Sequence, residues 1–249
     1  MLKQQTKKKL RKLRLDAAID AAEAMEGADS RLSKEEWLEI IVDRVYEEKM
    51  STKVNNLIRG VHFPCPAACV EDIIFAEDRK LDPGLIDSLA AGTYITKGRN
   101  VILMGAAGAG KSWIASALGV SACRQFAKTE YISMVEMCDE LAALRADPAS
   151  HQKRLKQLAT RKLLIIDDWL LMETGQDAVD ELFAVTEART KAKRSTIICT
   201  QYMVVGWPAR MGGYPAAESV VDRVKNNAYK VMIEGDISMR ERCMDEDLR

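Results

Sequence analysis

Gly105-Ala106-Ala107-Gly108-Ala109-Gly110-Lys111-Ser112 is the stretch that decides the fold of this chain of 249 residues. It matches the pattern G-x-x-x-x-G-K-[ST], the phosphate-binding P-loop. The three glycines let the backbone curl so that successive N–H groups point into one concavity. A helix that is expected to begin near Lys111 adds its positive N-terminal end. The stretch therefore predicts a cradle for the phosphates of a nucleotide.

The last two residues of the loop supply the side chains that a nucleotide site needs. Lys111 is expected to reach the β- and γ-phosphates of ATP, and the Ser112 hydroxyl is expected to ligate Mg²⁺. An apolar run at 100–104 predicts a strand before the loop, and the run from Trp113 onward has the spacing of a helix. Because strand, loop and helix follow in the required order, residues 105–113 are expected to bind the nucleotide within a parallel α/β fold.

A second apolar run ends in two carboxylates. The four aliphatic residues 163–166 predict a buried parallel strand, and Asp167 and Asp168 follow at the end where α/β sheets bind ligands. Downstream of a P-loop, this arrangement is a Walker B element. Asp167 is expected to hold Mg²⁺, directly or through water, and Asp168 is expected to polarise the attacking water as a base.

A third strand is expected between the two Walker elements in the sheet. Its β-branched run, residues 195–201, ends in Thr200 and Gln201. Because side chains alternate along a strand, one of these two is expected to point toward the γ-phosphate or the attacking water as a sensor. The sequence leaves open which one it is.

Composition narrows the class of protein. Hydrophobic residues make up 47% of the chain, and 37 basic residues balance 37 acidic ones, so overall charge does not identify a partner. The length suits one α/β domain with a small accessory segment. No apolar run is long enough to span a bilayer and no signal peptide is evident, so we expect a soluble protein of a reducing cytoplasm without a membrane partner.

One cluster of soft side chains invites a metal-binding interpretation. His62, Cys65 and Cys69 lie close together in the sequence. Their spacing is irregular, and no fourth ligand lies nearby. The alternative is a proline-rich connector that contains incidental thiols.

Basic residues gather in two segments. Residues 1–14 contain no acidic side chain, and residues 151–162 precede the Walker B strand. Residues 1–14 either contact DNA phosphates or form a solvated tail. Residues 151–162 either lie along nucleic acid that lines a ring pore or form a solvated helix face. The side chains expected to contact DNA are Lys7, Lys8, Lys9, Arg11, Lys153 and Arg154.

The region before the P-loop domain is predicted to be helical. One helix is expected over Leu15–Met25, a second from about 34 to 50 behind a capping box of Ser33 and Glu36, and a short third over 52–59. The prolines within 62–68 indicate a linker. We therefore expect a helical region at 1–65, which binds a client or DNA, and an ATPase domain at 66–249.

Taken together, these motifs resemble the IstB/DnaC-like branch of the AAA+ ATPases from about Leu32 to Arg240. The resemblance rests on the two Walker elements, on Phe63-Pro64 followed by Val70-Glu71-Asp72, and on Asp222-Arg223-Val224 followed by Gly235-Asp236-Ile237-Ser238-Met239-Arg240. Members of this branch are helper ATPases of insertion-sequence transposition or loaders of the replicative helicase. The resemblance implies a parallel sheet flanked by helices, with little or no C-terminal lid.

The resemblance also implies roles for two arginines. Arg223 would be the arginine finger that reaches the γ-phosphate held by a neighbouring subunit, and Arg240 would be a second arginine sensor acting on bound nucleotide. The alternative for each is a surface salt bridge. Asp168 departs from the glutamate of most AAA+ proteins, and its shorter side chain can slow hydrolysis.

The resulting hypothesis is an ATP-dependent assembly factor. ATP would bind between subunits of a homo-oligomer on duplex DNA, largely independent of DNA sequence, and hydrolysis would release the assembly. The Ser-Met-Arg ending favours a transposase as client over a replicative helicase. One alternative is a small-molecule P-loop kinase, but neither the lid nor the acceptor pocket of such an enzyme is evident after residue 201. The other is a nucleotide-dependent binding module with negligible hydrolysis, for which Asp168 is the only hint.

Overall fold

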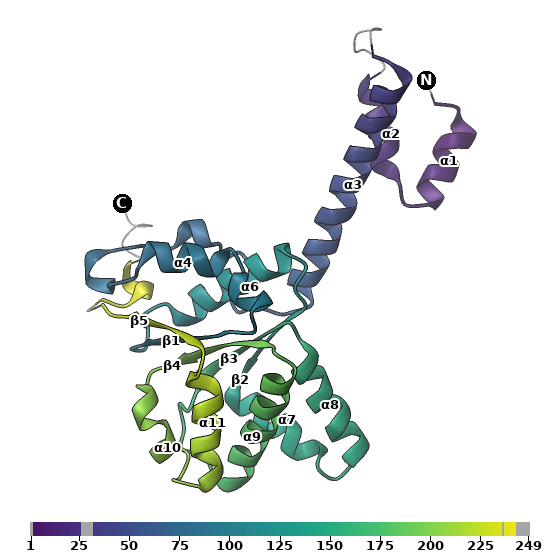
Figure 1. Ribbon diagram of the computed structural model, residues 1–249. Coiled ribbons are helices and arrows are strands. Elements are labelled where there is room, and N and C mark those ends of the chain that lie inside the picture. Colours follow the sequence, from purple (N-terminus) through teal and green to yellow (C-terminus); the bar gives the residue numbers. More distant parts are fainter. Residues whose placement is uncertain (1, 26–31, 236, 243–249) are drawn as a thin grey trace. The chain divides into compact units, whose positions relative to one another are not determined.

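The computed structural model describes residues 2–25, 32–235 and 237–242 (Figure 1). The chain divides into two compact units, Met1–Asn56 and Leu57–Arg249. The division falls within helix α3 (Lys34–Arg59), whereas the sequence placed the domain boundary after residue 65.

The larger unit is built on a parallel sheet. Its described strands are β1 (Asn100–Gly105), β2 (Thr129–Ser133), β3 (Leu163–Trp169), β4 (Ser195–Thr200) and β5 (Ala228–Ile233), in the spatial order β2-β3-β4-β1-β5. Every pairing between these strands is parallel, so their C-terminal ends meet at one edge. β4 lies between β1 and β3, as predicted, which separates the P-loop from the two carboxylates by one strand.

Helices cover both faces of this sheet (Figure 1). α4 (Pro83–Ala90) and α6 (Lys111–Arg124) lie on one face, and α7 (Met134–Leu144), α8 (Pro148–Thr160), α9 (Gln176–Lys191) and α11 (Pro215–Lys225) lie on the other. Strand alternation divides the core accordingly: Val101 and Leu103 pack on the α6 side, and Ile102 and Met104 on the opposite side. The predicted fold class, a parallel sheet flanked by helices, is confirmed.

Short elements connect the larger ones. They are the helices α5 (Thr93–Thr96) and α10 (Trp207–Arg210) and the 3-10 turns η2 (Val70–Asp72), η3 (Glu77–Arg79) and η4 (Val204–Gly206). In the parts of the chain that the structure describes, no helix has both the length and the apolar character that a membrane crossing requires.

The smaller unit contains α1 (Gln4–Lys12), α2 (Asp16–Ala24) and most of α3. The predicted capping box begins α3: the Ser33 N–H donates to Glu36 Oε2 over 2.7 Å, and the Glu36 N–H donates to Ser33 Oγ over 3.1 Å. The two helices expected on either side of Ser51 are in fact one continuous helix. Neither glycine nor proline stands near Ser51, so nothing there interrupts the helical hydrogen bonds.

The segment at 62–68, expected as a linker, is anchored to the larger unit by two buried side chains, Phe63 and Ala68. Phe63 is 5% exposed and belongs to the core on the α6 side. Its ring lies so close to Gly119 of α6 that a Cβ at Gly119 would stand 2.4 Å from it. His62, Cys65 and Cys69 form no metal-binding group among the described residues, and the Cys69 thiol instead donates to Asp72 over 3.0 Å.

Candidate nucleotide-binding site

The P-loop connects the end of β1 to the start of α6. Gly108 and Gly110 have φ angles of 78° and 87°, in the left-handed region that favours glycine. Gly105 is required for a different reason, because a Cβ there would lie 2.3 Å from the carbonyl oxygen of Ile233. Steric demands at all three positions therefore explain the glycine pattern of the motif.

Lys111 lies over the loop with only 9% of the residue exposed. Its ammonium group donates to the carbonyl oxygens of Gly105 over 2.9 Å and Ala106 over 2.7 Å. Burial lowers the pKa of Lys111, and the negative charges of Asp167 and Asp168 oppose that shift. The cation is thus held at the cradle, where phosphate oxygens can replace the two carbonyl acceptors.

The Walker B carboxylates sit on an irregularity of β3. Ile166 pairs with Ile198, but the next pairing joins Trp169 to Thr200, so two residues of β3 oppose one residue of β4. This is the geometry of a β-bulge, which re-aims side chains at the end of a strand. The backbone at Asp168 has a φ of 51°, in the left-handed region. The bulge leaves Asp167 8% exposed, whereas Asp168 is exposed to solvent.

Both oxygens of the Asp167 carboxylate accept hydrogen bonds. Oδ1 accepts from the backbone N–H of Asp168 over 2.9 Å, and Oδ2 accepts from the hydroxyl of Tyr131 on β2. The pKa of Asp168 is raised by partial burial and by the charge of Asp167, while Lys111 opposes the shift. A raised pKa makes the Asp168 carboxylate a stronger base than a free aspartate.

The two sensor candidates differ in their surroundings. Thr200 is 1% exposed, and its hydroxyl donates to the carbonyl oxygen of Trp169 and accepts from the N–H of Tyr202, each over 3.1 Å. Gln201 is exposed. Gln201 comes directly after the last residue of β4, at the bend that follows the strand. The Thr200 hydroxyl is therefore already bonded to the end of β3 and to the residues that follow β4.

A cavity of about 560 Å³ opens beside the loop. The described residues that line it include Ile73, Ile74, Trp113, Met239 and Arg240, together with Gly108, Gly110, Lys111 and Ser112. A volume of this size is typical of small-molecule sites. With the loop as a phosphate cradle, the cavity fits the base and sugar of a nucleotide, and Ser112 and Asp167 offer the oxygen ligands that Mg²⁺ prefers.

The C-terminal segment is attached to the loop. The Met239 N–H donates to the Gly108 carbonyl oxygen over 2.9 Å. Ser238 lies so close that a Cβ on Gly108 would stand 2.5 Å from its hydroxyl oxygen. Arg240 consequently lines the same cavity as the P-loop of its own chain, whereas Asp236 of the same ending lies outside the described residues.

Two side chains at this site were missed by sequence reasoning. Arg79 on η3 is 3% exposed and donates to the carbonyl oxygen of Ala109 over 2.8 Å, beneath the loop. Tyr131 lies on β2 beside Asp167. Neither residue belongs to a local motif, and only the pairing of β2 with β3 could have indicated Tyr131.

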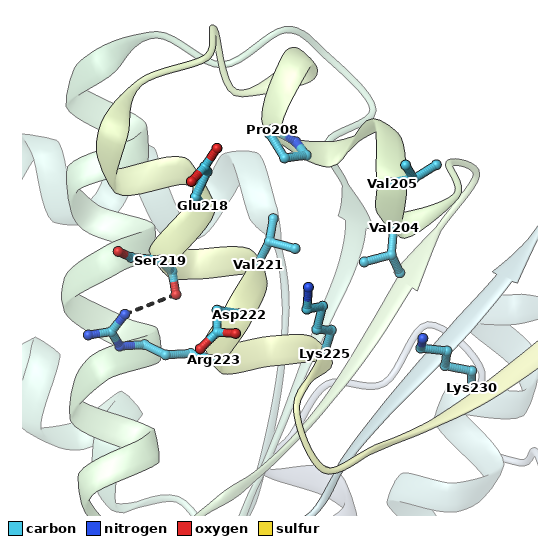
Figure 2. A pocket seen from close by; sticks show the side chains of 10 residues that line it. All are labelled: Val204, Val205, Pro208, Glu218, Ser219, Val221, Asp222, Arg223, Lys225 and Lys230. Carbon is cyan, nitrogen blue, oxygen red and sulfur yellow. Dashed lines mark hydrogen bonds between the residues drawn. The ribbon is translucent and has the colours of Figure 1, made fainter.

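Arg223 lies away from the P-loop of its own chain. It projects from α11 and donates to the Ser219 carbonyl oxygen over 3.0 Å (Figure 2). It also forms a salt bridge of 2.8 Å with Glu187 on α9. Its guanidinium also lies 4.8 Å from the ring centroid of Phe183. The surrounding pocket of about 740 Å³ shares none of the described residues that line the P-loop cavity; it is lined by Val204, Val205, Pro208, Glu218, Ser219, Val221, Asp222, Arg223, Lys225 and Lys230.

The expected DNA contacts fall into two groups. On α1, Lys8, Lys9 and Arg11 are exposed, whereas Lys7 forms a salt bridge with Glu23. On α8, Lys153 is exposed. The Arg154 side chain is only 14% exposed and bridges Glu130 over 2.7 Å and Glu140 over 2.8 Å, so its charge is already compensated inside the domain.

Comparison with known proteins places this site in context. The sequence profile of the family described as IstB-like ATP binding protein matches residues 8–246. An insertion-sequence ATP-binding protein of Sinorhizobium fredii is 33% identical over 242 residues, with 96% of each chain covered. The IS1162 ATP-binding protein of Pseudomonas fluorescens is 34% identical, with 81% of this chain and 87% of that protein covered.

Solved structures show the likeness of the fold. A DnaC helicase loader superposes with a TM-score of 0.57 at 19% identity and covers 68% of this chain and 97% of its own. The replication initiator DnaA, bound to AMPPCP and single-stranded DNA, superposes with a TM-score of 0.59 at 18% identity over 74% of this chain. This chain spans about half of that DnaA structure, 55% of its length.

Proposed function

Because the chain belongs to the family of IstB-like ATP-binding proteins, we propose that it is a Mg²⁺-dependent ATPase that assembles on DNA and recruits or activates a transposase. Hydrolysis controls disassembly. The observation that carries this proposal is the separation of Lys111 and Arg223 into different pockets of one chain. A site that needs both side chains is completed only when a second copy contributes its Arg223.

In the proposed reaction, the loop N–H groups bind the phosphates, and Lys111 exchanges its two carbonyl acceptors for phosphate oxygens. Ser112 and Asp167 would hold Mg²⁺, which would neutralise phosphate charge at this site. Asp168 accepts the proton of the attacking water. Gln201 orients that water as the sensor, since the Thr200 hydroxyl is already bonded to Trp169 and Tyr202.

The two arginines act from different subunits in this scheme. Arg240 acts on the nucleotide of its own chain, because Met239 is bonded to the P-loop next to it. Arg223 acts on the nucleotide of the neighbouring copy and leaves Glu187 to do so. The planar, permanently charged guanidinium of Arg223 can exchange a carboxylate partner for a γ-phosphate, because both groups present paired oxygens.

The relatives favour transposition as the setting, because the proteins that match most of this chain carry insertion-sequence names. A client surface is available on α3, where large apolar side chains are exposed, among them Trp37, Leu38, Ile40, Val42 and Tyr46. Replicative-helicase loading is the second candidate, and the fold shared with the DnaC loader favours it. A transposase and a replicative helicase offered in the same pull-down experiment distinguish the two.

Nucleotide-dependent assembly is the direct test. The protein should sediment as a larger species with duplex DNA and a non-hydrolysable ATP analogue than with duplex DNA and ADP, because only the triphosphate offers a γ-phosphate to Arg223 of a second copy. Analytical ultracentrifugation measures the sizes. A size that does not change with nucleotide or DNA would exclude the assembly factor and favour a small-molecule kinase.

The exposed basic residues of α1 should contribute to DNA affinity. Replacing Lys8, Lys9 and Arg11 together by alanine should reduce the slope of log affinity against log salt by about 2–3, because each lost phosphate contact removes about 0.9 from the slope. Fluorescence anisotropy with duplex DNA at several salt concentrations measures this. The control replaces the exposed Lys97 and Lys128, which lie outside both basic segments, and this variant should keep the wild-type slope. An unchanged slope in the α1 variant would show that α1 does not contact DNA.

A further inference from the structure

The register of β2 against β3 brings one tyrosine to the Walker B carboxylate. Tyr131 on β2 pairs with Ile165, and Asp167 lies two residues further along β3 on the same face of the sheet. Diagonal neighbours of this kind are within reach of an aromatic side chain. The Tyr131 hydroxyl accordingly donates to Oδ2 of Asp167. Burial, followed by the charge of Asp167, raises the pKa of Tyr131.

The same hydroxyl lies next to the other expected Mg²⁺ ligand. The pKa of Tyr131 is affected in the opposite direction by hydrogen bonding with the side chain of Ser112. Ser112 is at the start of α6 and Asp167 is at the end of β3, so these two ligands come from separate elements. Through its hydrogen bond to Asp167, Tyr131 on β2 brings a third element to the site.

The position of this hydroxyl is fixed independently of the P-loop. The Tyr131 backbone is held in the β2–β3 pairing. Its ring meets Phe63 edge-on, with the ring centroids 6.0 Å apart and the planes at 77°. Asp167 Oδ1 is held at the same time by the Asp168 N–H over 2.9 Å. Together the two donors fix the rotation of the Asp167 carboxylate.

We propose that Tyr131 is a positioning residue of the Mg²⁺ site, whose hydroxyl turns Asp167 toward Ser112 so that both side chains can hold one cation. Each carboxylate oxygen has two lone pairs, so Oδ2 can accept from Tyr131 and still bind the metal. Hydrogen-bond partners of metal ligands commonly tune metal affinity in this way. The inference rests on the proposed ATPase function, and it concerns the metal rather than the nucleotide.

Tyr131→Phe keeps the ring and removes only the hydroxyl. We expect the Mg²⁺ concentration that half-saturates the binding of labelled ATP to rise about 10–100-fold, the range typical for loss of such a partner. Binding of the same labelled ATP in excess EDTA should stay at the wild-type affinity, because the cradle is unchanged. Both quantities are measured by fluorescence anisotropy, without any turnover.

Tyr94→Phe is the matched control. Tyr94 is 1% exposed, and its buried hydroxyl has no hydrogen-bond partner within the described ranges, so the same chemical change is made away from the metal ligands. This variant should show the Mg²⁺ requirement of the wild type. A second check combines Tyr131→Phe with Asp167→Asn, where the loss of the hydroxyl should add little because the carboxylate it positions is absent.

The outcomes separate the two hypotheses. If Tyr131→Phe needs no more Mg²⁺ than the wild type, Tyr131 does not position the ligand. If it weakens binding equally with Mg²⁺ and with EDTA, the tyrosine supports the pocket as a whole, and the metal-specific role is wrong. If the wild-type protein itself binds no labelled ATP under either condition, the proposed function fails.

Discussion

Arg223→Ala should bind ATP with the affinity of the wild type and hydrolyse it about 10³–10⁵-fold more slowly, the range over which an arginine finger acts. Nucleotide affinity should not change, because Arg223 lines a different pocket from the P-loop. Turnover should fall, because the charge that develops on the γ-phosphate loses its guanidinium partner. Steady-state phosphate release and anisotropy with labelled ATP measure the two quantities.

Arg99→Ala is a suitable control for this variant. Arg99 also has an aromatic neighbour, with its guanidinium 5.7 Å from the ring centroid of Tyr229, but it does not line the Arg223 pocket. Its removal should leave turnover close to the wild-type rate. Normal hydrolysis by Arg223→Ala would show that the nucleotide site is not shared between copies.

Lys111→Ala should lose nucleotide binding itself. Lys111 carries the buried cation at the cradle, and hydrogen bonds to charged groups contribute about 1.5–3 kcal/mol each. Two such bonds to phosphate oxygens correspond to an affinity at least about 100-fold lower in the variant. Isothermal titration calorimetry with ATP measures the loss, and the exposed Lys97 provides the control substitution. Wild-type affinity in Lys111→Ala would place the nucleotide elsewhere.

The two inactive variants can be tested against each other. A mixed interface can join the intact P-loop of an Arg223→Ala copy to the intact Arg223 of a Lys111→Ala copy. Mixing the variants should therefore restore part of the hydrolysis that each lacks alone. Completion of the site within a single chain would leave the mixture as inactive as its components.

The position of the candidate site was largely predictable because its motifs are local. The spacing of glycines 105, 108 and 110 and the carboxylates at the end of an apolar strand can be recognised without knowing the fold. The placement of β4 between β1 and β3 also followed, since P-loop sheets share that order. These features depend on residues that are close in the sequence or on a family-wide topology.

Other features depend on contacts between distant segments. Tyr131 reaches Asp167 only through the exact register of two strands, and Arg79 reaches the loop across 30 residues of sequence. The sequence also gave no sign that Arg154 pairs with carboxylates on β2 and α7. The basic segment that suggested DNA contact therefore contains an arginine whose charge is already compensated. The continuity of α3 through Ser51 shows that polar residues alone do not end a helix.

The ion pair between Glu187 and Arg223 bears on how a cell would use such a protein. In an isolated copy the Arg223 guanidinium stays paired with Glu187. In the proposed scheme, such a copy binds ATP but does not hydrolyse it. When several copies bind next to one another on DNA, Arg223 of one copy would reach the ATP of its neighbour. Hydrolysis would therefore begin only where an assembly already exists. Each assembly would then begin to hydrolyse ATP, and so to disassemble, only after its subunits have joined.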